Sequence, residues 1–259
     1  VSSVMALQAE AVLSQQSTEN GQQTSFTLAK VIVICDEAIR LFPNSTGAKQ
    51  CRSIRSVILR KELTFKMQSV VLPNQEISAN ISYKNLTNPH YRIYKLNHNE
   101  LDELDGESKQ DIVKTLLKKN YIVENEIELP TTTRQNSSKD DYNYEAIITN
   151  NFDFFLPSLE CGIYFIMISK DDKFSKSEDN LPAIHAFQVS SLSFVTTKEN
   201  NDFVVYVLDR DSGKPIKDVN VNIYKRTYDY KTREYVNTTI ADLTSDKDGI
   251  VRLTDTEDN

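Results

Sequence analysis

Three cysteines are the first residues to consider for chemistry, because thiolates bind metals and act as nucleophiles. They are Cys35, Cys51 and Cys161. No two of them have the Cys-x-x-Cys spacing typical of zinc sites, and no histidine lies near any of them in the sequence. Cys161 precedes the strongly apolar run GIYFIMI, so we expect it to pack where that strand begins. The sequence therefore predicts no metal site, and Cys35 and Cys51 remain as a candidate pair.

The turn at residues 244–249, TSDKDG, is the nearest approach to a calcium motif. An EF-hand loop needs an oxygen ligand at its first position, a glutamate at its twelfth, and flanking helices. Here the first position is Thr244 and the twelfth is Asp255, and we expect strands on both sides. Aspartate and glycine are also the residues that hairpin turns use. We therefore interpret this segment as a turn, and Asp209-Arg210-Asp211 as a second turn with local charge pairing.

Histidine is the usual general base of enzymes, and the chain contains His90, His98 and His185. A catalytic triad holds its base between a nucleophile and a carboxylate, and no Gly-x-Ser-x-Gly or similar nucleophile setting occurs in the sequence. We therefore expect solvated or edge histidines. The sequence predicts no catalytic residues, no cofactor and no enzymatic activity.

Two further patterns could bind a ligand or carry a modification. The strand segment Tyr91-Arg92-Ile93-Tyr94 could form an aromatic and basic recognition strip, although a half-exposed strand gives the same alternation without a ligand. Asn-x-Ser/Thr sequences could accept glycans, although a chain rich in Asn, Ser and Thr acquires several by chance. They begin at Asn44, Asn80, Asn85, Asn136 and Asn237. We favour the structural explanation in both cases.

Length and composition limit the classes of protein to consider. At 259 residues the chain exceeds one ordinary domain, so two or three are expected. A formal charge of −7 argues against a nucleic-acid partner, which needs basic surfaces. No apolar run approaches the roughly 20 residues that cross a bilayer. Residues 1–16 lack the basic start and apolar core of a signal peptide, and both ends suggest a fragment of a larger protein.

Residues 1–61 have the periodicity of helices. Apolar residues recur at three- and four-residue spacing on both sides of a break at Pro43–Gly47, and Asn44 or Ser45 can cap the second helix. The first stripe is Leu28, Val31, Ile32, Cys35, Ala38, Ile39 and Phe42, and the second is Ala48, Cys51, Ile54, Val57 and Ile58. Cys35 and Cys51 should therefore face each other across a helical hairpin. We expect their Cα atoms within the roughly 7 Å that a disulfide allows; the pair is either two buried thiols or, in an oxidising compartment, a disulfide.

From Leu63 onward the period changes to two, which indicates strands. One helix, capped at Ser108, interrupts the strands and ends at Asn120. The strands expected are Leu63–Val71, Glu76–Lys84, Tyr91–Leu96, Tyr121–Leu129, Tyr142–Thr149, Gly162–Ser169 and Ala183–Val195. Seven short strands of this kind are typical of a β-sandwich.

The last fifth of the chain indicates a second sandwich. A strand ends in the turn DSGKP, and the next strand alternates Val219, Val221 and Ile223 with polar residues before the turn SDKDG. Side chains alternate between the two faces of a strand, so each of these runs buries one row and exposes the other. We expect residues 196–259 to lack at least one pairing strand, which leaves an open sheet edge.

The ordered succession of these segments resembles bacterial alpha-2-macroglobulin-like proteins, particularly the long versions of Bacteroides-type bacteria. The resemblance covers nearly the whole chain. It rests on AIRLFPNSTGAKQC, which looks like a tetratricopeptide-type hairpin, and on four later segments. These are SANISYKNLTNPHYRIYKL, FLPSLECGIYFIMISKDD followed by AIHAFQVSSLSFV, VLDRDSGKPIKDVNVNIYKR, and SDKDGIVRL.

The resemblance implies macroglobulin-like β-sandwich domains in a large envelope-associated protease trap. In such proteins a protease cuts a bait segment, the sandwiches rearrange, and thioester-bearing members capture the protease covalently. The thioester motif Cys-x-Glu-Gln does not occur in this sequence, since Cys161 is followed by Gly162-Ile163-Tyr164, and no bait segment can be assigned. The residues that carry the family's chemistry are thus not in this chain.

Together these observations predict an α+β chain, mainly β. We expect a helical hairpin at residues 1–61, a macroglobulin-like sandwich of the immunoglobulin or fibronectin-III kind at 62–195, and a second, incomplete sandwich at 196–259. The predicted role is a non-catalytic scaffold of a protease inhibitor in the periplasm or cell envelope, including a lipid-anchored form. Its partners would be other domains of the same chain and target proteases, with no nucleic acid and no membrane-spanning segment. The alternative is a cell-surface adhesion or glycan-binding sandwich module.

Overall fold

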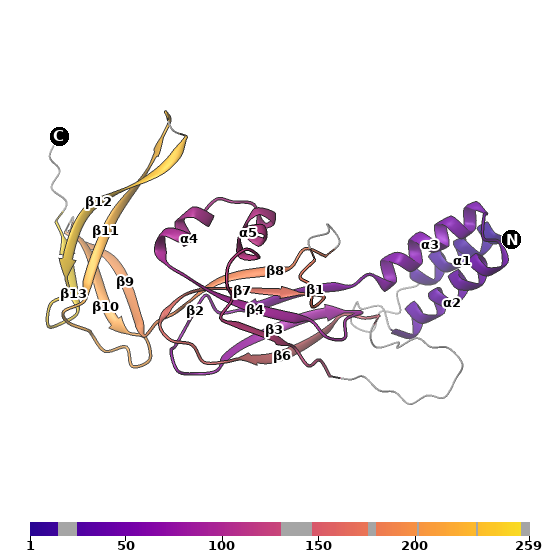
Figure 1. Cartoon of the computed structure of the whole chain (residues 1–259), viewed down its shortest axis with the longest axis horizontal. Helices are drawn as coiled ribbons and strands as arrows, with labels where there is room; N and C mark the ends of the chain where they lie inside the picture. Colours follow the sequence, from indigo (N-terminus) through magenta and orange to yellow (C-terminus); the bar gives the residue numbers. More distant parts are fainter. Residues whose placement is uncertain (15–24, 131–146, 176–179, 201, 232, 255–259) are drawn as a thin grey trace. The chain divides into compact units, whose positions relative to one another are not determined.

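The structure, a computed structural model, describes residues 1–14, 25–130, 147–175, 180–200, 202–231 and 233–254 (Figure 1). It is mainly β, with antiparallel sheets and five α-helices in this part of the chain. It divides into two compact units. The first comprises Val1–Ser69, Glu76–Pro157 and Ile163–Phe187, and the second Val70–Gln75, Ser158–Gly162 and Gln188–Asn259. The α+β, mainly β, class expected from the sequence is therefore confirmed.

The helical segment begins the first unit. It consists of α1 (Ser2–Ser14), α2 (Ser25–Leu41) and α3 (Thr46–Leu59). Of the two caps expected for α3, the structure selects Ser45, whose side chain accepts a hydrogen bond from the Ala48 N–H at 3.1 Å. The apolar stripes of α2 and α3 meet in one core, and α1 packs against both helices. A Cβ atom at Gly47 would lie 2.3 Å from the Ser2 carbonyl, so α1 and α3 cross too closely for any side chain there.

Two sheets follow the helical segment. The three-stranded sheet has the order β1-β3-β6, with β1 at Glu62–Met67, β3 at Ile77–Lys84 and β6 at Asn150–Leu156. The five-stranded sheet has the order β2-β8-β7-β4-β5. Its strands are β2 (Val70–Val71), β8 (Ala183–Val189), β7 (Gly162–Ser169), β4 (His90–Leu96) and β5 (Val123–Glu126). Strand β3 is antiparallel to β1 and β6, and β4 is antiparallel to β5 and β7, whereas β2 is parallel to β8. Of these strands, β2 and the last two residues of β8 belong to the second unit.

Aromatic contacts join the two sheets face to face. Tyr91 of β4 lies 6.3 Å from Phe154 of β6, and Phe65 of β1 meets His185 of β8 edge-on at 6.1 Å, measured between ring centroids. The opposite face of the five-stranded sheet is covered by α4 (His98–Leu104) and α5 (Lys109–Leu116), whose apolar residues pack with those of β4 and β7. Strand β7 is thus buried on both faces, which explains its unbroken apolar sequence.

The second unit is smaller. Its three-stranded sheet has the order β13-β10-β9, with β9 at Leu192–Glu199, β10 at Asp202–Asp209 and β13 at Ile250–Leu253. A two-stranded ribbon, β11 (Asn220–Asp229) and β12 (Glu234–Thr244), forms the other layer. Its core of buried residues consists of Val205, Val207 and Val251, with partly buried apolar side chains packed around them.

Some elements differ from the sequence-based expectation. The run Ala183–Val195 is two strands, β8 and β9, separated at Ser190-Ser191, and Leu63–Val71 is likewise divided into β1 and β2. Strand β6 follows the expected strand Tyr142–Thr149, of which residues 142–146 lie outside the described residues. Helix α4 was not expected, although Asn97 and Glu100 form a complete capping box at its start. No helix of the described chain is long and apolar enough to cross a membrane.

Candidate functional site: the Cys35–Cys51 pair

Helix packing brings the two predicted site cysteines together. Cys35 projects from α2 and Cys51 from α3, and neither side chain has any exposed surface. Their thiols interact through a side-chain hydrogen bond. The pair lies in the helical core with small residues of α1, such as Ala6 and Ala9. At the surface of the same two helices, Arg55 Nε pairs with Asp36 Oδ1 at 2.7 Å, which ties α2 to α3 beside the thiols.

The surroundings hold Cys35 in the thiol form. Burial, reinforced by the neighbouring Cys51, raises the pKa of Cys35 to about 12 from its ordinary value of 9.0. Desolvation disfavours the thiolate, and a thiolate is the form that attacks electrophiles and binds metals. Cys35 is therefore unsuited to nucleophilic or metal chemistry at neutral pH. The chemistry that remains for this pair is a disulfide bond between the two sulfur atoms.

The raised pKa predicts a pH dependence of stability. A group whose folded pKa exceeds its unfolded pKa contributes stability that is lost as pH rises from the unfolded to the folded value. For Cys35 that window runs from about pH 9 to about pH 12. We expect the free energy of unfolding to fall there by about 1.4 kcal/mol per pH unit more steeply than in Cys35→Ala. Denaturant titrations of both proteins under reducing conditions measure the two slopes, and equal slopes would contradict the prediction.

The other candidate residues serve local structure. The Asp246 carboxylate accepts hydrogen bonds from the backbone N–H groups of Asp248 and Ile250, both at 2.9 Å, as a hairpin turn requires. The Asp209 carboxylate accepts from the Ser212 N–H and hydroxyl, and these bonds lower the pKa of Asp209. Among the residues that the structure describes, no three or more His, Cys, Asp or Glu side chains are grouped so that they could hold a metal ion.

The remaining histidines and Cys161 only partly match the expectations. His98 is exposed and His90 partly exposed, whereas His185 is half-buried and desolvation lowers its pKa. Its Nε2 atom has no hydrogen-bond partner, so His185 is an apolar packing residue. Cys161 does stand where β7 begins, but its side chain is exposed, so the expected packing role is wrong.

The aromatic and basic strip is largely internal. Tyr91 and Tyr94 are 4% and 1% exposed, so their rings are not available as a recognition surface. Arg92 Nε pairs with Glu124 Oε2 of β5 at 3.1 Å, and its guanidinium lies 4.0 Å from the centre of the Phe174 ring. The ion pair lowers the pKa of Glu124. Sequence reasoning missed this cluster because Arg92 and Glu124 become opposite residues only once β4 and β5 pair.

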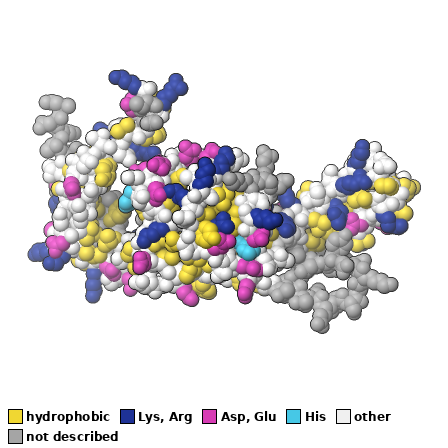
Figure 2. All heavy atoms as spheres, viewed as in Figure 1, with side chains coloured by type: hydrophobic (Ala, Val, Ile, Leu, Met, Phe, Trp, Pro, Cys, Tyr) yellow, Lys and Arg dark blue, Asp and Glu magenta, His cyan; other side chains and the backbone are white. Residues whose placement is uncertain are grey.

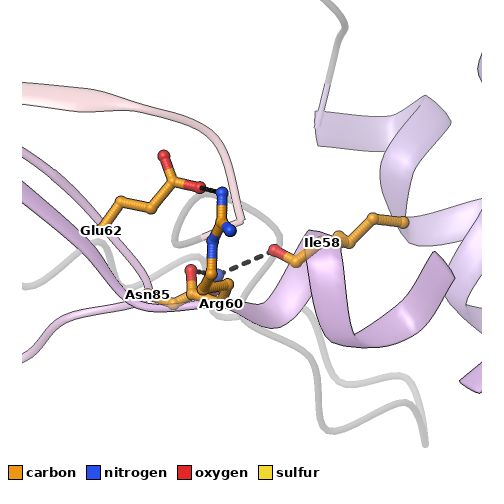
Figure 3. Close-up of polar contacts among 4 residues, drawn as sticks. All are labelled: Ile58, Arg60, Glu62 and Asn85. Carbon is orange, nitrogen blue, oxygen red and sulfur yellow. Dashed lines mark hydrogen bonds and ion pairs between the residues drawn. The ribbon is translucent and has the colours of Figure 1, made fainter. Parts of the chain in front are cut away.

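A second contact that the sequence did not reveal lies where α3 ends (Figure 3). Asn85 Nδ2 donates to the carbonyl of Ile58 at 2.9 Å and to that of Arg60 at 3.2 Å. The last carbonyls of a helix have no partner within the helix, so the Asn85 amide supplies one from the end of β3. Arg60 is held in turn by an ion pair with Glu62 at 3.3 Å. The same Nδ2 atom would carry a glycan at this sequence, so the contact favours the structural role of Asn85.

We expect Asn85→Gly to lower the free energy of unfolding of the first unit by about 1 kcal/mol, the usual contribution of such hydrogen bonds. Glycine tolerates the left-handed backbone of Asn85, whose φ is 53°, so the substitution removes the amide without adding strain. Asn74→Gly is the control for the backbone conformation, since Asn74 has a φ of 59° in the turn between β2 and β3 and belongs to the second unit. Thermal unfolding and amide exchange in the last turn of α3 measure the effect. Equal changes in the two variants would show that the Asn85 amide contributes nothing.

No protein-family model matches the sequence, and no curated protein matches it. Among solved structures, the chain is similar to native alpha-2-macroglobulin from Escherichia coli spanning domains NIE-MG1, with 11% identity and a TM-score of 0.49 over 77% of this chain and 89% of that one. It is similar to the fragment spanning MG0-NIE-MG1, with 13% identity and a TM-score of 0.45 over 76% of this chain and 58% of that one. A mutant Salmonella alpha-2-macroglobulin gives 11% identity and a TM-score of 0.38 over 74% of this chain and 10% of that one. These similarities do not carry the function of those proteins to this chain.

Proposed function

We propose that this chain is a non-catalytic scaffold within an alpha-2-macroglobulin-like protease inhibitor of the bacterial periplasm or cell envelope. The proposal includes a helical domain at 1–61, a macroglobulin-like sandwich at 62–195 and an incomplete sandwich at 196–259. The observation that carries it is the order of elements along one chain. A helical segment, a unit of two facing sheets and a smaller strand-rich unit follow one another, in the order of the motifs on which the sequence resemblance rests.

The side chains support a scaffold over an enzyme. The acidic residues of both conspicuous turns accept hydrogen bonds from their own turn. Both candidate thiols are buried, and burial raises the pKa of Cys35. The strip around Arg92 is occupied by internal packing and an ion pair. In this proposal the chain holds other domains of the same protein in place, and those domains engage a target protease.

Protease challenge of the complete gene product tests the proposal. The protein is incubated with proteases of different specificity, and cleavage and high-mass adducts are followed on denaturing gels. Residual protease activity is then measured on a large protein substrate and on a small chromogenic peptide. A trap should give one preferred cut and loss of activity on the large substrate alone, because a trapped protease still admits small peptides.

The isolated 259-residue chain is the control, and it should neither form adducts nor inhibit. Slow, scattered cleavage of the complete protein with full activity on both substrates would overturn the proposal. That outcome would favour the adhesion or glycan-binding alternative, which a glycan array would then examine directly.

A further inference from the structure

The far end of the β11–β12 ribbon extends past the core of the second unit. Both strands of the ribbon are longer than β10 and β13, and the ribbon side chains that pack on the core, such as Val221 and Leu243, lie near its base. In Figure 1 the other end of the ribbon extends beyond the three-stranded sheet. Residues 224–235, which we call the ribbon tip, therefore lie outside that core.

Strand pairing gathers three tyrosine rings at the ribbon tip. Tyr228 of β11 is opposite Tyr235 of β12, so these two side chains share a face of the ribbon. Their ring centroids are 5.1 Å apart, and Tyr230, which follows β11, meets Tyr228 at the same distance. Tyr228, Tyr235 and Tyr230 are 39%, 61% and 86% exposed. Single exposed aromatic side chains are ordinary, whereas a cluster of them indicates an interaction surface.

The ribbon tip is also rich in basic residues. It contains four basic and two acidic residues, a net charge of +2 in a chain whose formal charge is −7. Lys225, Lys231 and Arg233 are exposed. The Arg226 guanidinium lies 4.5 Å from the centre of the Tyr235 ring. Figure 2 shows Lys and Arg side chains, in dark blue, at this end of the ribbon with hydrophobic side chains, in yellow, beside them. An anionic surface would therefore be attracted to the ribbon tip of an otherwise acidic protein.

The ring geometry favours a lipid interface over a flat ligand. A nucleic-acid base binds by stacking on an open aromatic face. Tyr228 meets Tyr230 and Tyr235 at interplanar angles of 85° and 64°, so the three rings form no shared platform, and Arg226 already lies over the Tyr235 ring. The interface between water and lipid requires no platform, because each amphipathic ring can orient separately with its hydroxyl group in the polar layer.

We infer that the ribbon tip docks on the surface of an anionic lipid bilayer, with the three tyrosine rings at the level of the headgroups and the basic side chains against lipid phosphates. Tyrosine is enriched at this interface, and Lys and Arg are attracted to anionic lipids. Backbone pairing of the two strands continues to Asp229 and Glu234, next to the turn, which lowers the cost of bringing the ribbon tip out of water. The inference does not rest on the protease-inhibitor proposal, and it concerns binding to a membrane surface.

A single tryptophan placed at the ribbon tip reports the contact directly, because the chain contains no tryptophan. The test uses the 259-residue chain carrying Tyr230→Trp and vesicles of phosphatidylglycerol and phosphatidylcholine in equal parts. We expect the emission to shift to shorter wavelength on these vesicles, and brominated lipids to quench it. Phe155→Trp is the matched control, since Phe155 is 62% exposed but lies on β6 of the first unit. Its emission should not change.

Two charge-matched variants test the basic side chains. Binding is measured as the fraction of protein that floats with vesicles as the lipid concentration rises. Lys225→Gln combined with Lys231→Gln should weaken binding about thirtyfold, or about fivefold for each lysine, since a basic residue near an anionic surface contributes about 1 kcal/mol. Lys49→Gln combined with Lys66→Gln makes the same change of net charge at exposed positions of the first unit. This second variant should bind nearly as the original chain does.

Tyr230→Ser tests the aromatic contribution. Tyr230 is the most exposed of the three rings, so its removal should leave the ribbon folded and weaken binding by about fivefold or more, because apolar ring surface no longer enters the interface. Phe155→Ser, the control in the first unit, should leave binding unchanged.

Three results of the flotation assay would overturn the inference. They are no binding to the anionic vesicles, equal binding to vesicles of phosphatidylcholine alone, and equal loss of binding in the two lysine variants. Vesicle binding with unchanged emission of Tyr230→Trp would place the contact elsewhere on the chain and would also overturn it. Binding to soluble polyglutamate without binding to vesicles would assign the ribbon tip to an acidic protein instead. Inhibition of a protease by the complete protein is measured separately, so either proposal can fail alone.

Discussion

Joining Cys35 and Cys51 in a disulfide is expected to raise the free energy of unfolding of the helical segment by about 3 kcal/mol, the value for a closed loop of about 15 residues. Residues 36–50 lie between the two cysteines, and they contain the turn from α2 to α3. A cross-link there restricts the unfolded chain while the thiols are already in contact in the folded one. The oxidation removes two protons and two electrons from the thiols, and oxidised glutathione accepts them by becoming two molecules of glutathione.

The route to the disulfide should depend on when the oxidant acts. In the folded chain both thiols are inaccessible and the pKa of Cys35 is raised to about 12, so attack by its thiolate should be very slow. During refolding the thiols are exposed and exchange proceeds. In a Cys161→Ser background, which removes the exposed thiol that would itself exchange with glutathione, we therefore expect a mass decrease of about 2 Da and higher stability after refolding with oxidised glutathione, and neither change after treatment of the folded protein.

Cys51→Ser is the control for this experiment, since it retains a small polar group but cannot form the bridge. Its stability should be the same after both treatments. Alkylation in denaturant reports the number of free thiols, and in the Cys161→Ser background both Cys35 and Cys51 should be free after treatment of the folded protein and neither after refolding with the oxidant. If refolding with oxidant gives mixed disulfides with glutathione and no internal bridge, the two sulfur atoms are not positioned to join.

Most of the fold could be predicted from the sequence, because burial sets the periodicity of the apolar residues along each helix and strand. The stripe with Val31, Ile32 and Cys35 predicted the core of α2, and all three residues are fully buried. The unbroken apolar run of β7 predicted a strand, although its burial on both faces became evident only with α4 and α5 in place. The boundary between two strands was harder to predict where no glycine or proline marks a turn between them, as at Ser190-Ser191 between β8 and β9.

The contacts at the candidate sites could not be derived because they join residues distant in the sequence. Asn85 meets Ile58 only when β3 ends beside α3, and the Asn-x-Thr pattern at Asn85 suggests a different explanation. By contrast, the burial of Cys35 and Cys51 in one helical core could be predicted from helical periodicity, since both residues belong to the apolar stripes of helices joined by a short break.

Gly249→Ala is expected to destabilise the second unit by about 2 to 4 kcal/mol, which combines left-handed strain with a clash in a packed region. Gly249 has a φ of 72°, and a Cβ atom there would lie 2.6 Å from the Val207 carbonyl oxygen and 2.9 Å from Pro215 Cβ. That oxygen accepts a hydrogen bond from the Ile216 N–H at 3.0 Å, and the Gly249 carbonyl accepts one from the Val207 N–H at 2.8 Å. Moving the Val207 carbonyl aside would therefore disturb both bonds.

Gly213→Ala separates the clash from the strain. Gly213 has a similar φ of 68°, but a Cβ atom there would meet nothing within 4 Å. It should cost about 1 kcal/mol through backbone strain alone. The buried core of the second unit is small and consists of Val205, Val207 and Val251. The larger loss of stability expected in Gly249→Ala should therefore unfold this unit while the first stays folded. Amide exchange and limited proteolysis should then show β10 and β13 opening in Gly249→Ala and not in Gly213→Ala. If both variants lose the same stability, the close approach at Gly249 does not hold the unit together.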